Sequence, residues 1–369
     1  MGKYKGSLKD YSATTLVNSA AFEAISRANL EVDDLQEAVI GSSFSNKREI
    51  ELRYPMKDAS AKSVPLIFVD DGCHSGLKAV TLAADSIQLG QVESVLCGGV
   101  ESMSNSMIQQ ECPRSSKRLR ETTAKDKAIL CFGGSIGYDA CQESRRLMEK
   151  YGISDSELYR YSAMSRERAL KATSRALFEE ELAGLLAPEP LANSIVNDEV
   201  QAGHLGGGAL PESGGEIIEG STSAMGDGAA CLVAMSREEA RRRRVEPLFS
   251  IIDYSRMQPR DHLSGKACAD SITGVLAKSG FALGDISLLE LHESSAASVM
   301  ATGLALGLDF SKVNINGGAL AFGHPVGCSG ARMLVTLYYA LKHSDGHLGL
   351  LSIEAANGSS MALLMEREN

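Results

Sequence analysis

The chain of 369 residues lacks several features that mark special classes of protein. It has no apolar run of about 18 residues, so no membrane-spanning helix is expected. The first ten residues lack the apolar core of a secretory signal peptide, and the end of the chain carries no targeting motif that we recognise. The eight cysteines include no Cys-x-x-Cys pair, which indicates free thiols in a reducing compartment. We therefore expect a cytoplasmic protein with no membrane partner.

An excess of positive charge is lacking too, because the formal net charge is −10. This balance argues against nucleic acid as a partner. The four consecutive arginines at 241–244 follow a short helical pattern and are interpreted as a helix C-terminus, where the helix dipole favours cations. The length predicts two or three domains, and a hydrophobic content of 44% is typical of a globular protein.

Two distant segments of the chain resemble each other. Residues 73–83 and 327–337 each place Ser-Gly at an expected helix start, continue with Lys or Arg, and then become apolar. Their offset of 254 residues (327 − 73) is far longer than a solenoid repeat, so a duplicated, layered α/β domain is predicted. Expected strands lie at 64–69, 94–99, 248–252, 348–353 and 361–365, the last two joined by a hairpin turn at Asn357-Gly358.

The middle of the chain has a different character. Residues 113–127 carry six Lys and Arg side chains, which fit either a solvated surface loop or a cationic clamp for a phosphorylated ligand. Residues 141–151 and 154–183 have amphipathic patterns typical of helices. Residues 201–215 are rich in glycine and are expected to form a loop.

A histidine lies in a glycine-rich turn. Residues 314–330 contain five glycines, which allow close approach of the backbone to a ligand, and Pro325 stiffens the loop after His324. The apolar run from Ala331 to Leu341 is predicted to be a buried helix. His324 therefore lies next to a helix N-terminus, where developing negative charge is favoured.

A cysteine occupies the related position in the first half. Cys73 follows a predicted strand and begins a predicted helix, a placement that lowers a thiol pKa below its usual value of about 8.5. Its polar, glycine-bearing flanks distinguish it from the other cysteines, which are expected to be buried apolar residues. If the two repeats pack around a pseudo-twofold axis, Cys73 and His324 meet. Such a pair supplies the nucleophile and the base that covalent acyl transfer needs as a minimum.

Five ordered motifs carry a resemblance to a known family. They lie at residues 71–79, 98–105, 219–230, 291–296 and 316–330. In this order they are similar to the nucleophile motif of the thiolase family, its following strand, the end of its first half, its Asn/His-Glu-Ala-Phe-Ala box and its Gly-His-Pro motif. The similarity extends from about residue 2 to residue 366.

The resemblance implies a duplicated αβαβα layered fold with an inserted loop domain. The N-terminal half would comprise residues 1–112 and 216–242, the loop domain residues 113–215 and the C-terminal half residues 243–369. The implied activity is that of an acyl-CoA-dependent C-acyltransferase, with coenzyme A thioesters as substrates and with neither a metal nor a permanently bound cofactor. The implied assembly is a homodimer or homotetramer, with a partner enzyme of its pathway as a further candidate.

The resemblance also implies roles for individual residues. Cys73 would be the acylated nucleophile and His324 its base, while His292 would help to form an oxyanion site. The N–H groups near Cys73 and Ala356 would form a second oxyanion hole, and Ser223 would contact the pantetheine arm. The basic segment with Arg114 and Arg118 would lie in the loop domain that covers coenzyme A.

Two positions depart from the family pattern. Glu354 occupies the position of the second catalytic cysteine on the last hairpin, and Ser294-Ser295 replaces Ala-Phe in the histidine box. A glutamate could remove the α-proton of an acyl-CoA if burial raised its pKa from about 4.3 towards neutrality. A carboxylate is a poorer acid and base than a thiol for reversible thiolysis near pH 7, so a condensation in the biosynthetic direction is expected. The two serines are expected to give a larger, wetter pocket.

Three functions remain open from the sequence. The leading hypothesis is a non-decarboxylative Claisen-type condensation through an acyl-enzyme on Cys73, with Glu354 as the α-proton base. The second is acyl transfer to an amine, hydroxyl or water, in which Glu354 activates that acceptor. The third is a non-catalytic scaffold, in which Glu354 marks the loss of a catalytic step; the presence of both Cys73 and His324 argues against it.

Overall fold

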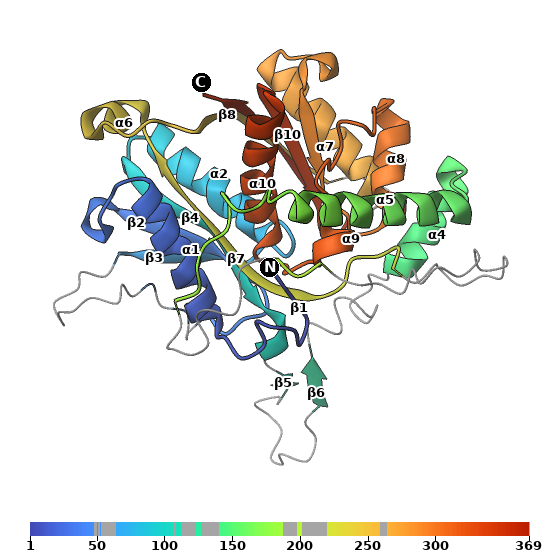
Figure 1. The fold of residues 1–369 in the computed structure, drawn as a ribbon, viewed down its shortest axis with the longest axis horizontal. Helices are drawn as coiled ribbons and strands as arrows, with labels where there is room; N and C mark the ends of the chain where they lie inside the picture. Colours follow the sequence, from blue (N-terminus) through green and yellow to red (C-terminus); the bar gives the residue numbers. More distant parts are fainter. Residues whose placement is uncertain are drawn as a thin grey trace.

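Two β-sheets separated by helices organise the chain (Figure 1). The computed structural model describes residues 1–47, 50, 52, 64–106, 108–111, 123–126, 140–186, 198–200, 220–258 and 264–368. Strands from residues 2–235 form the first large sheet, and strands from residues 249–367 form the second. This arrangement confirms the predicted layered α/β fold. Within the described residues, no helix is long and apolar enough to cross a membrane.

The first sheet has five strands in the order β1-β7-β4-β2-β3. Strands β2, β3 and β4 are parallel, whereas β4 pairs antiparallel with β7, and β7 with the short β1. Helix α1 covers the outer face of the sheet, on β7 and β4. The elements of this half are β1 (Gly2–Lys3), α1 (Ala13–Arg27), β2 (Glu37–Gly41), β3 (Leu66–Val69), α2 (Ser75–Gln88), β4 (Ser94–Ser102), β7 (Gly226–Met235) and α6 (Arg237–Arg243), with 3-10 turns at Val32–Asp34 and Met103–Asn105.

The second sheet repeats this pattern with four strands in the order β8-β11-β10-β9. Its parallel pair β9–β10 and antiparallel neighbour β11 correspond to β2, β4 and β7, as a duplication predicts. Helix α7 covers the outer face, and α8 packs against α7. The elements are β8 (Phe249–Met257), α7 (Ser264–Ser279), β9 (Leu288–Leu291), α8 (Ala296–Leu306), α9 (Ala319–Phe322), α10 (Ser329–Ser344), β10 (Leu348–Glu354) and β11 (Ser360–Arg367), with a 3-10 turn at Leu283–Asp285.

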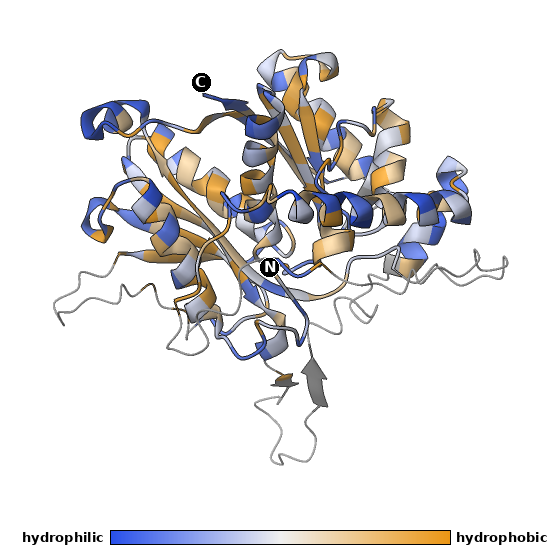
Figure 2. Cartoon of the chain, in the orientation of Figure 1, coloured by the Kyte–Doolittle hydropathy of each residue, from blue (hydrophilic) through white to orange (hydrophobic). Residues whose placement is uncertain are grey.

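The repeated helices α2 and α10 pack against each other between the sheets (Figure 1). Their Ser-Gly starts touch directly. A Cβ atom added to Gly76 would lie 2.8 Å from the Gly327 carbonyl oxygen, and one added to Gly330 would lie 2.6 Å from the Leu77 backbone nitrogen. Only glycine allows the two backbones to approach this closely. The apolar residues of both helices and of the facing strands form the largest core, visible as the orange interior in Figure 2.

Two helices from the middle of the chain lie against the second half. Helix α4 (Ala140–Tyr151) matches the predicted helix at 141–151 and packs on α8, and α5 (Asp155–Ser174) packs on α8 and α9. The prediction that the second helix continues to residue 183 is wrong. The chain leaves the helix at Ala176, which adopts a positive φ of 57°, and the Leu177 N–H then bonds the Ala172 carbonyl at 3.1 Å. A glycine, the usual signal for this ending, is absent.

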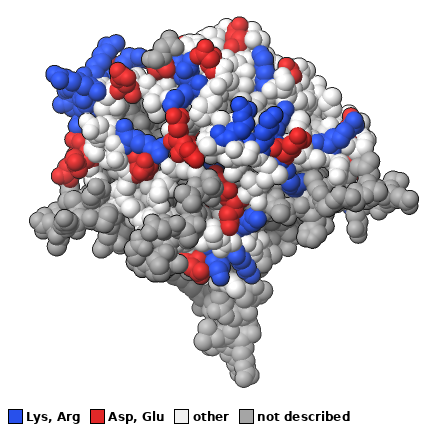
Figure 3. Space-filling view, in the orientation of Figure 1, with Lys and Arg blue, Asp and Glu red and all other residues white. Residues whose placement is uncertain are grey.

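The four arginines end helix α6 as predicted. Arg244 forms its left-handed C-cap with φ 58°. Lys and Arg side chains gather over α6 at one corner of the face in Figure 3. Arg242 and Arg243 both pair with the carboxylate of Glu239, and Arg243 also reaches Asp34 at 2.6 Å. These acidic partners within the chain account for the cluster without a nucleic-acid ligand. A short hairpin, β5 (Ile108–Glu111) with β6 (Thr123–Asp126), completes the described strands.

Candidate active site

Cys73 lies on the turn between β3 and α2. The turn is held by Ser75, whose hydroxyl accepts from the Asp71 N–H at 2.9 Å and donates to the Gly72 carbonyl at 2.6 Å. Gly72 has a positive φ of 58°, which the sharp strand-to-helix connection requires. Cys73 as a whole residue is 9% exposed, so the turn presents it at the helix start with limited access to water.

His324 reaches this cysteine from the second half. Its ring Nε2 lies 3.2 Å from Cys73 Sγ, and its Nδ1 lies 2.6 Å from the hydroxyl of Ser329, the first residue of α10. Its backbone N–H donates to the Ala224 carbonyl at 2.8 Å, which fixes the loop against the end of the first half. Burial, followed by the charges of His292 and Arg332, lowers the pKa of His324 well below 6.5. The structure thus brings together the two residues that the repeat predicts to meet.

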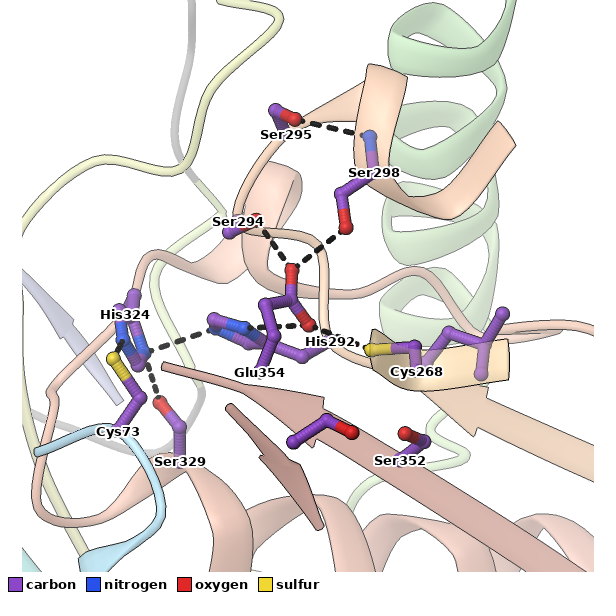
Figure 4. A network of polar contacts seen from close by, with 12 residues as sticks. Cys73, Cys268, His292, Ser294, Ser295, Ser298, His324, Ser329, Ser352 and Glu354 are labelled. Atoms are coloured by element: carbon purple, nitrogen blue, oxygen red, sulfur yellow. Dashed lines mark hydrogen bonds and ion pairs between the residues drawn. The ribbon is translucent and has the colours of Figure 1, made fainter. Parts of the chain in front are cut away.

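His292 and Glu354 extend the pair into a chain of four groups (Figure 4). His292 follows β9, and its Nε2 lies 3.2 Å from His324 Nδ1. On the opposite side of the ring, its Nδ1 lies 3.5 Å from Oε2 of Glu354, the last residue of β10. This second separation is that of an ion pair, and the Nδ1 atom has no hydrogen-bond partner among the described residues. All four groups are buried, with Glu354 only 1% exposed.

The carboxylate of Glu354 is surrounded by donors. Its Oε1 accepts from the hydroxyls of Ser294 and, at 2.9 Å, Ser298, while its Oε2 accepts from the Cys268 thiol at 3.3 Å. Burial alone would raise the pKa of Glu354, but the charge of His292 and the hydrogen bonds from Ser294 and Cys268 outweigh it and lower the pKa to about 2. The condition for a glutamate base, a pKa raised towards neutrality, is therefore not met, because a carboxylate with this many donors stays ionised.

The two serines of the histidine box have structural partners. Ser294 donates to Glu354, and the Ser295 hydroxyl caps helix α8 by accepting from the Ser298 N–H at 3.1 Å. Ser295 is 4% exposed. Both hydroxyls are therefore engaged within the protein, and the expectation that the two serines give a larger, wetter pocket stays a prediction.

The remaining predicted residues divide into two groups. Ser223 is buried in the segment before β7, and its N–H donates to the Ser294 carbonyl at 3.0 Å, so it lies beside the histidine box. Ala356 is half-buried in the turn between β10 and β11, two residues after Glu354. Arg114 and Arg118 lie outside the described residues, as does most of the segment 113–139.

Two buried glutamates that the sequence reading missed hold the site together. Glu101, the last residue but one of β4, accepts from the N–H groups of Ser43 (2.9 Å), Ser45 (2.7 Å) and Gly327 (3.0 Å), and so ties the His324 loop to the first sheet. Glu293 accepts from the hydroxyl of Tyr161 on α5 at 2.9 Å, and its other partners are Ser165, Asn314 and Leu320. A charged residue inside a strand of small and apolar residues was the available signal for Glu101.

Comparisons with known proteins identify the family. The family description "Thiolase, N-terminal domain" matches residues 1–238, and "Thiolase, C-terminal domain" matches residues 245–367. The chain belongs to the thiolase family. It is an acyltransferase of that family, as its relatives are.

Curated relatives align over the whole chain. Acetyl-CoA acetyltransferase of Escherichia coli is 31% identical over 386 residues, covering 100% of this chain and 97% of that protein. The enzyme of the same name from Allochromatium vinosum is 29% identical over 379 residues, covering 100% of this chain and 96% of its own.

Solved structures are similar over the same extent. Acetyl-CoA acetyltransferase of Bacillus anthracis has a TM-score of 0.85 and 27% identity, covering 100% of this chain and 96% of that one. Human mitochondrial 3-ketoacyl-CoA thiolase in complex with CoA shares the fold with a TM-score of 0.86 at 24% identity, covering 100% of this chain and 95% of that one.

Proposed function

We propose that this thiolase-family chain condenses two acyl-CoA molecules through an acyl-enzyme on Cys73. The observation that carries the proposal is the 3.2 Å contact between Cys73 Sγ and His324 Nε2, made by residues 251 positions apart at the starts of two packed helices. A thiol within hydrogen-bond reach of an imidazole is the arrangement that covalent acyl transfer requires.

In the first half-reaction, His324 Nε2 takes the thiol proton of Cys73 as the sulfur attacks the thioester carbon of an acyl-CoA. The tetrahedral intermediate collapses, the carbon–sulfur bond to coenzyme A breaks, and the leaving thiolate receives the proton from His324. Backbone N–H groups of Cys73 and Ala356 are proposed to stabilise the oxyanion, since they lie at a helix start and at the last hairpin turn.

In the second half-reaction, a different base from the one predicted is proposed. Glu354 is buried and ionised, and donors occupy both of its oxygens, so it is poorly placed to take a proton from a substrate carbon. We assign the α-proton to His324, whose Nε2 is released once the Cys73 sulfur is acylated. The resulting enolate attacks the Cys73 thioester, and the Cys73 thiolate leaves and recovers the proton from His324.

The direction of the reaction is proposed to be biosynthetic. Thiolysis in this family uses the thiol of a second cysteine, and here that position holds a carboxylate with a pKa of about 2. A carboxylate that stays ionised at neutral pH has no proton to give to a leaving enolate. In the mechanism above, His324 would carry this proton in both directions, so the carboxylate removes the role of the second cysteine without fixing the direction, and the biosynthetic direction stays a prediction.

Substrate binding and assembly are part of the same proposal. Ser223 would contact the pantetheine arm, and Arg114 and Arg118 would bind the phosphates of coenzyme A. A homodimer in the cytoplasm is proposed, because β3 is the edge strand of the first sheet and its Ile67 is 47% exposed. Within the described residues no strand pairs with the free edge of β3, and such an edge with an exposed apolar side chain is a site for pairing between chains.

The acyl-enzyme is tested by mass spectrometry. The protein is incubated with a panel of acyl-CoA thioesters, and a mass increase equal to the acyl group is expected on the peptide that contains Cys73. The variant Cys73→Ala serves as the control and should carry no adduct there. Absence of an adduct from every thioester would refute the proposal, and a new carbon–carbon bond in the released product would establish the condensation.

Acyl transfer to another acceptor is the second candidate. This candidate is favoured because Glu354 is no longer assigned as the α-proton base. Acylation of Cys73 needs only Cys73 and His324. The activation of a water, amine or hydroxyl would also fall to His324. The released product separates the candidates: a free acid, amide or ester supports this one.

A further inference from the structure

The two departures from the family pattern touch each other. Glu354 replaces the second cysteine and Ser294 lies in the altered histidine box, and the Ser294 hydroxyl donates to Oε1 of Glu354 (Figure 4). Both flank His292, whose Nδ1 faces Glu354 Oε2 at 3.5 Å. The residues that depart from the family pattern therefore form one connected group and are not independent substitutions.

This group is built to hold a negative charge. Three hydrogen-bond donors from two helices and the loop before α8 converge on the carboxylate of Glu354: the hydroxyls of Ser294 and Ser298 and the thiol of Cys268. A buried carboxylate is stable only when it is paired and hydrogen-bonded. Within the described residues, the one side chain in contact with it that can take up a positive charge is the imidazole of His292.

We propose that Glu354 is a positioning residue that acts on Cys73 through the two imidazoles and does not touch the substrate. The contacts run in one line, from Glu354 to His292 Nδ1 (3.5 Å), from His292 Nε2 to His324 Nδ1 (3.2 Å), and from His324 Nε2 to Cys73 Sγ (3.2 Å). Each imidazole uses one nitrogen towards the carboxylate and one towards the thiol. The inference rests on the proposed role of Cys73 as nucleophile.

The line of contacts lets one proton move at each step. In the resting state the thiol donates to His324 Nε2, and the Nδ1–H of His324 points towards His292 and Ser329. When Cys73 ionises, His324 gains a proton at Nε2 and passes the one at Nδ1 to His292 Nε2. The positive charge then lies on His292 beside Glu354. The Ser329 hydroxyl suits both states, because a hydroxyl can accept or donate.

The location of this charge explains why a relay is useful. Burial lowers the pKa of His324 well below 6.5, so His324 holds a proton poorly by itself. On His292 the same charge is paired with the Glu354 carboxylate. Among the described residues, the groups that act on the relay include Arg332, which acts on His324, Cys268, which donates to Glu354, and Glu143, which acts on Cys268.

The test measures the reactivity of the thiol without any coenzyme A substrate. The rate of alkylation of Cys73 by iodoacetamide is followed by peptide mass spectrometry from pH 5 to 10 in the full-length protein. For Glu354→Gln we expect alkylation at pH 7 to fall about tenfold, with the midpoint of the profile moved up by about one pH unit. Ser298→Ala should move the midpoint in the same direction by a smaller amount.

A matched control separates this role from a structural one. Glu239 on α6 is also a buried, ion-paired glutamate, remote in the fold from the relay, and Glu239→Gln should leave the Cys73 profile unchanged. An unchanged profile in folded Glu354→Gln would overturn the relay. If Glu354→Gln does not fold, the profile of Ser298→Ala decides in the same way. An acyl adduct on Cys73 together with an unchanged Glu354→Gln profile would refute the relay and leave the proposed function standing.

Discussion

Replacing Glu101 by glutamine should destabilise the protein, because two backbone N–H donors would lose their hydrogen-bond acceptor. In the wild-type chain Oε1 accepts from the N–H groups of Phe44 (3.0 Å) and Ser45 (2.7 Å), and Oε2 accepts from those of Ser43 (2.9 Å) and Gly327 (3.0 Å). A glutamine has one oxygen and one NH₂ group. Whichever way the amide turns, its NH₂ group faces two of these backbone N–H groups, and both then lose their acceptor.

The magnitude follows from these contacts. Glu101 is fully buried, so water cannot replace the lost acceptors. Each buried donor left without a partner costs about 1–3 kcal/mol, so Glu101→Gln should lower the free energy of unfolding by about 2–6 kcal/mol. The Gly327 N–H belongs to the loop that carries His324, so alkylation of Cys73 at pH 7 should also slow in the variant.

The assay is urea-induced unfolding at pH 7, followed by circular dichroism. The control variant is Glu93→Gln, because Glu93 is exposed and its contact with Arg242 is a 3.4 Å surface ion pair. Such pairs contribute about 0–1 kcal/mol, so the control should unfold like the wild type. A loss below about 1 kcal/mol in Glu101→Gln would refute the reasoning that the carboxylate is an indispensable acceptor.

Two further predictions concern burial. Burial raises the pKa of Glu290 to about 8, and its Oε2 has no hydrogen-bond partner among the described residues. The Glu290 carboxyl ionises above about pH 4.5 in the unfolded chain but only near pH 8 in the folded chain. The free energy of unfolding of the wild type therefore falls as the pH rises across that window. Glu290→Gln should then raise the free energy of unfolding at pH 7 by about 3 kcal/mol, at about 1.4 kcal/mol per pH unit, with no gain at pH 4 in urea titrations. An equal gain in the free energy of unfolding at pH 7 in Glu246→Gln, a substitution of an exposed glutamate, would contradict the assignment of the effect to burial. Gly330→Ala places a Cβ 2.6 Å from the Leu77 backbone nitrogen, so we expect a loss of about 1–3 kcal/mol in thermal unfolding and slower alkylation of the nucleophile. Gly184→Ala, with no atom within 4 Å of its added Cβ, should change neither.

The central pair of the site was predictable because it lies within a repeat. The two Ser-Gly helix starts predict equivalent helices, and equivalent helices in a duplicated fold meet near the symmetry axis. The structure shows this meeting in the close packing of Gly76 and Gly330 against the opposite backbone. The strands followed equally well from short apolar runs bounded by turns, as at β10 and β11.

The properties of Glu354 were not predictable from its neighbours in the chain. Its ionisation depends on Cys268, which precedes it by 86 residues, and on Ser294, which precedes it by 60. No local pattern announces that these side chains converge on one carboxylate. The end of α5 was missed for a simpler reason: Ala176 takes a left-handed conformation that sequence patterns assign to glycine or asparagine.

Glu101 was missed although its position carried a signal. A strand buried along its whole length, as β4 is, excludes charged residues unless they are fully paired. The sequence therefore indicates a special function for Glu101, but its partners come from the loop after β2 and from the His324 loop. Only the packed halves reveal that the residue connects them.

The packing of α2 against α10 has a consequence for how the protein is made. The ribosome synthesises Cys73 early and His324 251 residues later, and the sheet behind α10 has β11, the last strand described, between β8 and β10. A nascent chain that exposes the cysteine turn has not yet placed His324 beside it. In the proposed mechanism the thiol would become a competent nucleophile only when the second half has folded onto the first, and incomplete chains would be protected from premature acylation.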